Sequence, residues 1–148
     1  MFRGSSYHKI DIKGRVIIPA RFRDAIKTEN RKGVMVSTFD GSLVAYPYAE
    51  WQNVENKILS LARTSDTMRR FRRVFIGGAF DCSCDKQDRI LLPPSLREYA
   101  DLKKEIVLVG VLKIFEIWSR EKWDAERANL DEDFKNEEVR NEIAQLGL

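Results

Sequence analysis

The chain carries one short phrase twice, and this duplication limits its fold more than any other feature. The two copies are "GRVIIPARFR", residues 14–23, and "DRILLPPSLR", residues 88–97. Each copy contains an arginine, three branched apolar residues, a proline, two further residues, a bulky apolar residue and a second arginine. The copies lie 74 positions apart in a chain of 148 residues. A duplicated block of this kind predicts two copies of one supersecondary unit.

Weaker matches extend the repeat across the chain. Asp11 aligns with Asp85 at the same shift of 74, and apolar and aromatic positions further along match at a shift of 72. The two missing residues fall between the matching blocks, where gaps are tolerated. We therefore expect two repeat units, residues 1–76 and 77–148, that together form one compact domain. Two copies are too few for a solenoid and suit a closed pair related by a pseudo-twofold axis.

Local patterning gives both units the same order of elements. Short apolar runs indicate buried strands, and each run ends at a proline that fits the first turn of a helix. A strand hairpin, marked in the first unit by Asp40-Gly41, and a longer helix follow. In the first unit we expect strands at 16–18, 33–39 and 42–47 and helices at 19–26 and 49–62, and in the second strands at 90–92, 105–111 and 113–119 and helices at 93–100 and 120–139.

Two further helical features follow from residue spacing. Four apolar residues recur at helical spacing in the long helix of the first unit, which predicts a buried stripe. These residues are Trp51, Val54, Ile58 and Leu61. Between the units, residues 65–75 indicate another helix, with Ser65 as its N-cap.

Charge is distributed unevenly, although the net charge is only +3. Residues 1–33 carry a net charge of +6, residues 63–73 a net +4, and residues 120–148 a net −4. Basic segments of this kind favour a polyanionic partner, but an uneven solvated surface has the same pattern. The run "RRFRR" at 69–73 is more typical of a solvated helix face, and it could also contact phosphates or the acidic tail of a neighbour.

Several functional classes are disfavoured. No apolar run approaches the ~20 residues of a membrane span, and the start of the chain lacks the apolar core of a secretory signal. Two cysteines, Cys82 and Cys84, in such a chain suggest a reducing compartment, so we expect a cytoplasmic protein. They fit buried or half-buried strand residues better than zinc ligands, and the single histidine, His8, lacks partners for a metal site. We expect no metal, no cofactor, no small-molecule substrate and no membrane partner.

The order of the motifs resembles one known family. The stretch "MFRGSSYHKIDIKGRVIIPARFR" opens the chain, and an Asp-x-x-x-Arg pattern occurs in both halves. Together with the segments "LVAYPYAEW" and "LVGVLKIFEIW", these features are similar to those of the MraZ proteins. The order, duplication and spacing of the motifs are specific in combination, and the resemblance covers nearly the whole chain.

This resemblance implies a fold and a function. MraZ proteins are similar to AbrB-type regulators, so the implied fold is α+β, with two tandem pseudo-symmetric swapped-hairpin β-barrel halves of SpoVT-AbrB type and flanking helices. The family forms ring-shaped homo-oligomers and regulates transcription of the bacterial division and cell-wall gene cluster, usually including its own gene. The implied partner is double-stranded DNA that carries short direct repeats upstream of that cluster, and the implied location is the nucleoid.

The implied DNA contacts fall on the two repeated turns. Arg15 and Arg89 suit bidentate contact with guanine or with phosphate, and Asp11 and Asp85, four residues earlier, could orient them. Gly14 allows positive φ in the first turn. Three lysines near the turns add attraction to phosphate that does not depend on base sequence, and these are Lys9, Lys13 and Lys86. The Asp-Arg pairs could instead be structural clamps on each turn.

The second turn departs from the family pattern. Asp88 stands where the first turn, and the family in general, has a glycine before the arginine. Aspartate tolerates left-handed backbone, so the turn survives, but the added negative charge weakens the attraction for phosphate. We therefore expect the first turn to contribute more to DNA binding, unless Asp88 accepts a hydrogen bond from a cytosine amino group.

Two other functional classes stay open. A hydrolase could use Asp11 and Asp85 as paired carboxylates. The single histidine, the lack of a nucleophile motif and the arginine beside each acid argue against any enzyme. A ring-forming protein-interaction scaffold without specific DNA binding would use the acidic tail as its contact. The sequence favours a non-enzymatic, DNA-binding regulator over both.

Overall fold

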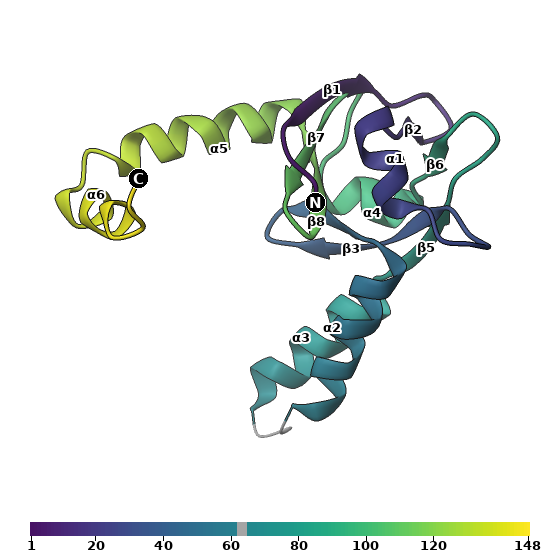
Figure 1. The fold of residues 1–148 in the computed structure, drawn as a ribbon, viewed down its shortest axis with the longest axis horizontal. Coiled ribbons are helices and arrows are strands. Elements are labelled where there is room, and N and C mark those ends of the chain that lie inside the picture. Colours follow the sequence, from purple (N-terminus) through teal and green to yellow (C-terminus); the bar gives the residue numbers. More distant parts are fainter. Residues whose placement is uncertain (62–64) are drawn as a thin grey trace.

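A computed structural model describes residues 1–61 and 65–148 (Figure 1). The elements, in chain order, are β1 (Ser5–Lys9), β2 (Arg15–Ile17), α1 (Ala20–Ile26), β3 (Gly33–Phe39), β4 (Ser42–Tyr46), α2 (Tyr48–Ser60), α3 (Asp66–Gly77), β5 (Phe80–Ser83), β6 (Arg89–Leu91), α4 (Pro94–Tyr99), β7 (Glu105–Val111), β8 (Ile114–Ser119), α5 (Arg120–Asp133) and α6 (Glu137–Ala144). This is the expected α+β fold. Ala62, at the end of the helix predicted at 49–62, and Arg63, in the basic segment 63–73, lie outside the described residues.

The strands form a six-stranded antiparallel sheet in the order β1-β7-β8-β4-β3-β5 and a two-stranded ribbon of β2 with β6. Exchanging each strand before α3 with its counterpart after α3 gives the same order read from the opposite edge of the sheet, as a twofold axis requires. Strands from the two halves of the chain therefore interleave, with β1 on β7 and β5 on β3. Two pairs of repeat-equivalent residues lie directly opposite each other, Val44 with Glu116 and Val16 with Ile90. The pseudo-twofold axis passes through both pairs.

The interpretation of the short apolar runs as buried strands holds for their outer residues but not for their central ones. Val16 and Ile18 are fully buried, but Ile17 between them is 47% exposed, and Leu91 in the second copy is 55% exposed. The physical reason is the two-residue period of a strand. The ribbon covers the core with one face only, so the middle residue of each run points to the other face.

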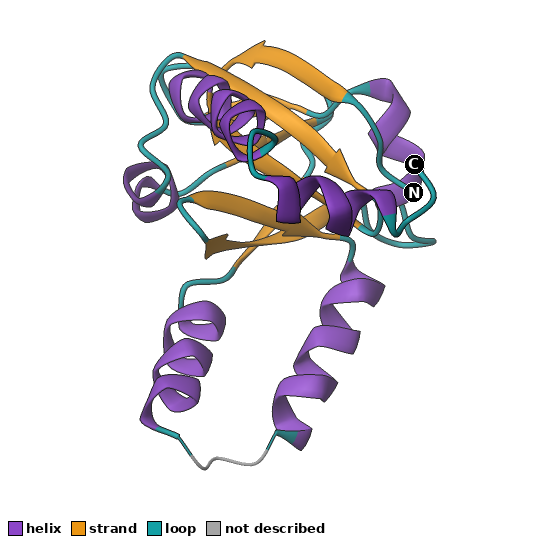
Figure 2. Cartoon of the chain, turned by 90° about the vertical axis from the view of Figure 1, so that its left-hand side faces the viewer, coloured by secondary structure: helices purple, strands orange, loops and turns teal. Residues whose placement is uncertain are grey.

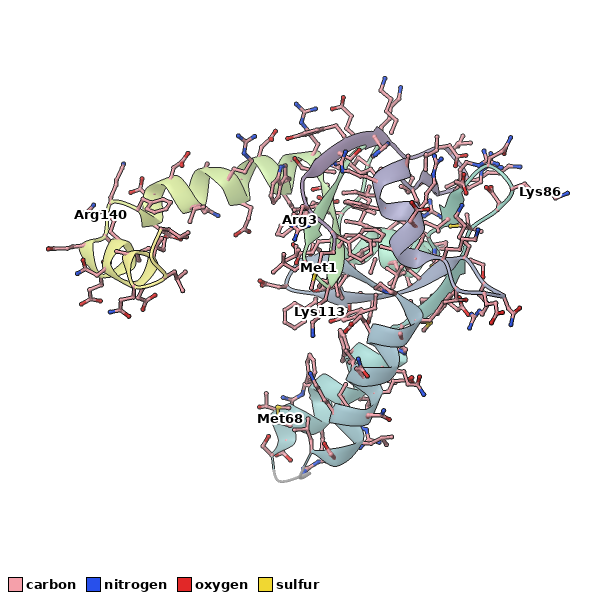
Figure 3. The ribbon with its side chains drawn as sticks, in the orientation of Figure 1. Met1, Arg3, Met68, Lys86, Lys113 and Arg140 are labelled. Carbon is pink, nitrogen blue, oxygen red and sulfur yellow. The ribbon has the colours of Figure 1, made fainter. Side chains whose placement is uncertain are left out.

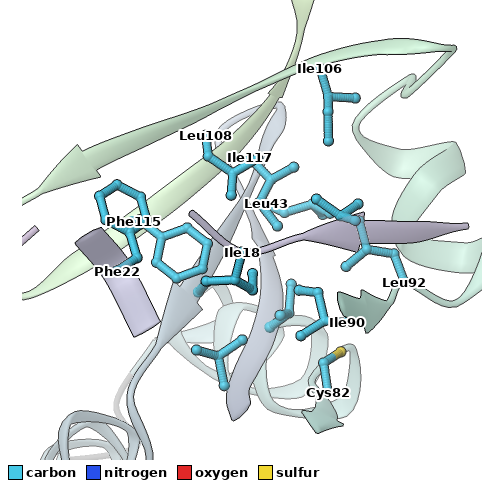
Figure 4. Close-up of a cluster of buried hydrophobic side chains, with 14 of the residues drawn as sticks. Ile18, Phe22, Leu43, Cys82, Ile90, Leu92, Ile106, Leu108, Phe115 and Ile117 are labelled. Carbon is cyan, nitrogen blue, oxygen red and sulfur yellow. The ribbon is translucent and has the colours of Figure 1, made fainter. Parts of the chain in front are cut away.

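The main core fills the space between the large sheet, the ribbon and the short helices α1 and α4 (Figure 4). Both halves contribute the same positions, because the side chains that alternate inward on the strands come from both copies of the repeat. Three phenylalanines, Phe2, Phe22 and Phe115, lie with their ring centroids 5.1–5.3 Å apart. Burial of large apolar side chains makes the largest favourable contribution to the stability of a folded domain. The core thus joins the two halves into one folding unit.

Helices α2 and α3 form a hairpin that projects from the body (Figure 2). Trp51 and Ile58 of α2 are buried against Phe75 of α3, which confirms most of the predicted stripe. Leu61 is 47% exposed, so its assignment to the stripe is wrong; it follows the last helical residue and has extended backbone. The prediction for Ser65 is confirmed, because its hydroxyl accepts the Met68 N–H at 3.0 Å.

The C-terminal helix is also different from the prediction, which placed one helix at 120–139. α5 ends at Asp133 and α6 begins at Glu137. The break arises because the side chain of Asn136 accepts the Glu138 N–H at 2.9 Å, and a cap of this kind starts a new helix. Figure 1 shows α5 leading away from the body, with α6 at its far end.

Candidate nucleic-acid interface

The first turn is organised by one carboxylate. Asp11 Oδ1 accepts the backbone N–H groups of Lys13 at 3.0 Å and Arg15 at 2.8 Å. Asp11 Oδ2 accepts the Nε–H of Arg15 at 2.5 Å. Gly14, at φ +90°, occupies the left-handed region that favours glycine. The Asp-x-x-Gly-Arg sequence therefore fixes both the backbone of the turn and the direction of its arginine.

The second turn repeats this arrangement. Asp85 Oδ1 accepts the backbone N–H groups of Gln87 and Arg89, each at 2.9 Å. Asp85 Oδ2 accepts the Nε–H of Arg89 at 2.8 Å. Asp88 takes the place of the glycine and has φ +59°. The expected bracing of each arginine by the aspartate four residues before it is thus present in the geometry of both turns.

The electrostatics of both turns keep the aspartates ionised. The backbone N–H of Arg15 is the main cause of a lowered pKa at Asp11, and the backbone N–H of Arg89 does the same for Asp85. Within residues 1–61 and 65–148, the side chains of Arg15 and Arg89 donate hydrogen bonds through Nε alone. The two terminal nitrogens of each guanidinium, with four N–H groups, are left for a ligand.

The two arginines lie on one face of the β2–β6 ribbon. Arg15 is paired with Leu91, and Ile17 is paired with Arg89. Residues opposite each other in an antiparallel pair, and residues two apart on a strand, point to the same face. The outer face of the ribbon therefore presents two arginines on one diagonal and two exposed apolar side chains on the other. A two-stranded ribbon with such a face has dimensions that fit the major groove of DNA.

Each turn is bonded to the opposite half of the chain. The backbone N–H of Ile18 donates to the carbonyl of Asp88 at 2.9 Å, and the N–H of Leu92 donates to the carbonyl of Gly14 at 2.9 Å. These two bonds are related by the pseudo-twofold axis. The separation between the turns is therefore set by the ribbon and its own hydrogen bonds, which preorganises the two arginines relative to each other.

The glycine of the first turn has a steric reason as well as a conformational one. A Cβ at Gly14 would lie 2.9 Å from the Leu92 carbonyl oxygen and 2.9 Å from Nε of Arg97. Arg97 itself is held because its Nε–H donates to Leu92 at 3.0 Å. The first turn therefore packs directly on a guanidinium from α4.

In the second turn, Asp88 is engaged by cations of its own chain. Its Oδ1 accepts a hydrogen bond from Nζ of Lys32, and its Oδ2 lies 3.4 Å from Nη1 of Arg23. The hydrogen bond from Lys32 is the main cause of a lowered pKa at Asp88. The carboxylate is directed at these two cations, which disfavours the alternative in which it reads a cytosine amino group.

The predicted lysines are not all in the same place. Lys13 and Lys86 are exposed within the two turns, and Figure 3 shows Lys86 at the tip of its loop. Lys9 ends β1, opposite Glu105 of β7, and lines a hollow that also includes Arg120 at the start of α5. Lys9 therefore belongs to the large sheet rather than to the first turn.

Sequence reasoning missed one pair of repeat-equivalent lysines. Lys32 lies beside the second turn, and its repeat equivalent, Lys104, lines a hollow of about 430 Å³ together with Asp11 and Arg97 beside the first turn. The shift of 72 that relates the two β-hairpins also relates Lys32 to Lys104. Applying that shift to every charged residue would have matched Lys32 with Lys104, although only the fold shows that each lies beside a turn.

The remaining candidate residues have structural surroundings. Cys82 is buried and Cys84 half-buried, both with free thiols, and burial raises the pKa of Cys82 to about 12. His8 lies on β1, where its Nε2 is 2.6 Å from the Ser6 hydroxyl. Asp11 and Asp85 are each bonded to the arginine of their own turn and have lowered pKa values, whereas a general acid needs a raised one.

Comparison with known proteins shows the family to which the chain is similar. The profile of the family described as "MraZ protein, putative antitoxin-like" matches residues 1–74 and again residues 75–142. The chain is 59% identical to the transcriptional regulator MraZ of Desulforapulum autotrophicum and 49% identical to that of Desulfosudis oleivorans. Each alignment spans 148 residues and covers the whole of this chain and the whole of the relative. It is also 43% identical to the MraZ of Pelotomaculum thermopropionicum, over all of this chain and 99% of the relative.

This chain belongs to the MraZ family. The MraZ relatives are named as transcriptional regulators and not as enzymes, which confirms both the resemblance and the non-enzymatic interpretation. Its function is accordingly that of a transcription regulator. Within the part of the chain that the structure describes, no helix is both long and apolar enough to cross a membrane.

Proposed function

We propose that this MraZ-family chain regulates transcription by binding double-stranded DNA with sequence specificity. The target is a set of short direct repeats upstream of the bacterial division and cell-wall gene cluster, including the chain's own gene. Such a regulator would act in the cytoplasm, at the nucleoid. The proposal rests on one observation above all, the two braced arginines on the exposed face of the β2–β6 ribbon.

In this proposal the aspartates, the arginines and the lysines each have a separate role. Asp11 and Asp85 orient the arginines, whose terminal nitrogens contact guanine O6 and N7 or phosphate. Lys13, Lys86 and Lys9 contribute attraction to phosphate without reading sequence. We favour direct contact of Arg15 and Arg89 with DNA over a purely structural role in clamping the turns. A structural clamp needs only the Nε–H groups that bond the aspartates, and it does not require the terminal guanidinium nitrogens to be exposed on the ribbon.

Assembly completes the proposal. The two repeat units, 1–76 and 77–148, form one compact domain with one two-turn face, and a homo-oligomeric ring presents several such faces. Direct repeats spaced by about one helical turn of DNA could then be bound together. Contacts that are individually weak gain from this multivalency.

The test is fluorescence anisotropy at ~150 mM salt with DNA from upstream of this chain's gene and with a scrambled duplex of the same composition. The variants are Arg15→Ala and, as a matched control, Arg3→Ala. Arg3 is exposed and lies at the other side of the body from the second turn, as Figure 3 shows for Arg3 and Lys86. We expect tight binding to the upstream DNA alone, lost in Arg15→Ala and retained in Arg3→Ala.

The other outcomes separate the alternatives. Equal binding to both duplexes would make the protein a DNA-coating factor without sequence specificity. No binding to either duplex would favour the ring-forming interaction scaffold, and the Asp-Arg pairs would then be structural clamps.

A further inference from the structure

The C-terminal arm, defined as residues 124–148, lacks the packing that usually stabilises helices. Every residue of the arm is exposed except Val139 and Ile143, which are half-buried. Four of its apolar side chains are also exposed, at 49% for Leu130, 38% for Phe134, 73% for Leu146 and 89% for Leu148. Helices of this length are marginal in water without tertiary contacts. The arm is therefore built to pack against another surface.

The segment that leads into the arm, residues 119–123, forms its base and is anchored to the body. Trp123 packs against Trp118 of β8 with ring centroids 5.9 Å apart, and the Ser119 hydroxyl accepts the Lys122 N–H at 3.1 Å. Lys122 Nζ also donates to the carbonyl of Gly41 at 3.3 Å. The direction of the arm is thus fixed by its base, while the acidic remainder extends away from the sheet.

Helix α3 offers a surface with the complementary character. Arg70 and Arg73 are exposed, and within the described residues neither forms a hydrogen bond or an ion pair. A hollow of about 340 Å³ on this helix is lined by Arg69, Arg72, Arg73, Ile76 and Gly77. Met68 and Val74 add exposed apolar area, at 39% and 57%. Helix α3 thus combines positive charge with apolar surface, where the arm combines negative charge with apolar surface.

The arm and α3 of one copy are not partners of each other. Figure 1 shows them leaving the body in different directions. Among the described residues, no hydrogen bond or ion pair joins the two. A contact between them therefore has to be made between copies. It is a head-to-tail contact, and contacts of that kind generate closed rings or open filaments.

We propose that the C-terminal arm of one copy docks on α3 of the next copy. Acidic residues of the arm meet Arg70 and Arg73, and its exposed leucines pack beside Met68 and Val74. The inference rests on the proposed homo-oligomer and assigns the faces that form it. It also gives the run at 69–73 a role in assembly rather than in DNA contact.

Charge reversal tests this pairing. The α3 variant is Arg70→Glu with Arg73→Glu, and the arm variant is Asp131→Lys with Glu142→Lys. Both lysines of the arm variant fall near helix C-termini, where a cation is favourable, so helix formation is preserved. Sedimentation velocity should show a rise of at least about tenfold in the concentration at which half of the subunits are assembled, for each variant alone. The chain with all four substitutions should regain assembly.

The control is Arg3→Glu with Lys113→Glu, which reverses two exposed cations on the body (Figure 3). It should assemble as the wild type does, and circular dichroism should show that all variants are folded. Unchanged assembly in either single-sided variant, or no recovery in the combined one, would overturn the inference. So would a wild-type chain that stays monomeric at every concentration.

DNA binding, measured on the same samples with a duplex that holds one repeat, separates this inference from the proposed function. Intact assembly in the α3 variant with normal DNA binding refutes only the arm contact. If the variants show that assembly depends on these charges but the wild type binds no upstream DNA, only the DNA-binding proposal is refuted.

Discussion

The two turns of the ribbon share one frame but present different electrostatic surfaces. In both turns an aspartate accepts the same two backbone N–H groups and the Nε–H of its arginine. The turns differ at the position before the arginine, which is Gly14 in one and Asp88 in the other. The difference shows that the backbone of the turn can be conserved within one chain while the charge around it is changed.

The charge difference reaches beyond the turns themselves. Asp88 is paired with Lys32 and Arg23, so these cations are partly neutralised beside the second turn. Their repeat equivalents at the first turn, Lys104 and Arg97, form no ion pair within residues 1–61 and 65–148. The first turn therefore has more uncompensated positive charge near it, and this supports the expectation that it contributes more to DNA binding.

The largest expected effect concerns the space available for a side chain at the position before the arginine in each turn. Gly14→Ala should lower the free energy of unfolding by about 3 kcal/mol, because it combines a positive φ with a Cβ placed against the Leu92 carbonyl. Urea unfolding followed by circular dichroism measures this. The reciprocal change, Asp88→Gly, should alter the free energy of unfolding by less than about 1 kcal/mol. Equal effects would show that the two turns have the same steric demands.

The next effect concerns the arginines. Arg15→Ala should weaken binding to upstream DNA by about 2 kcal/mol, within the range for loss of a bidentate base contact, and Arg89→Ala should cost about half as much. Anisotropy titrations at fixed salt measure both. If Arg89→Ala weakened binding more than Arg15→Ala, the proposed ranking of the turns would be wrong.

A smaller effect should follow from removing the charge of Asp88. Asp88→Asn keeps a residue that tolerates positive φ and releases Lys32 and Arg23, so affinity for DNA should rise a few-fold. The slope of log affinity against log salt should steepen by about 1 for each added phosphate contact. Asp40→Asn is the matched control, because Asp40 has φ +53° and forms no ion pair in the described part of the chain. Identical salt slopes for the two variants would show that Asp88 does not restrain those cations.

The comparison also shows where sequence reasoning succeeds. The repeat predicted a closed pair of units related by a pseudo-twofold axis, and the Asp-x-x-x-Arg spacing predicted the aspartate-arginine contact in both turns. Both follow from local spacing and from symmetry, which a sequence records directly. The exposed positions of Ile17 and Leu91 were missed because a three-residue apolar run does not reveal which face of a two-stranded ribbon is covered.

Contacts between distant segments were harder to predict. The pairing of Asp88 with Lys32 joins residues 56 positions apart, and nothing in either local sequence indicates it. The break before α6 was missed for a different reason, because Asn136 is an ordinary residue within a helical pattern until its side chain caps the next turn. Charges at Lys104 and Arg97 acquire significance only when the fold places them beside the first turn.

The smallest expected effect tests what the two turns have in common. The folded-state pKa values of Asp11 and Asp85 are lowered, so each carboxylate adds stability that is fully present above its unfolded pKa of about 4. This stability is lost as pH falls through the lower folded-state pKa.

The difference in unfolding free energy between the wild type and Asp11→Asn should therefore be constant near neutral pH and should shrink in acid. Asp85→Asn should give the same curve, because both carboxylates are bound by equivalent N–H groups. Urea unfolding at a series of pH values measures both. A difference that persists undiminished to about pH 3 would mean that the charge of the carboxylate does not brace the turn.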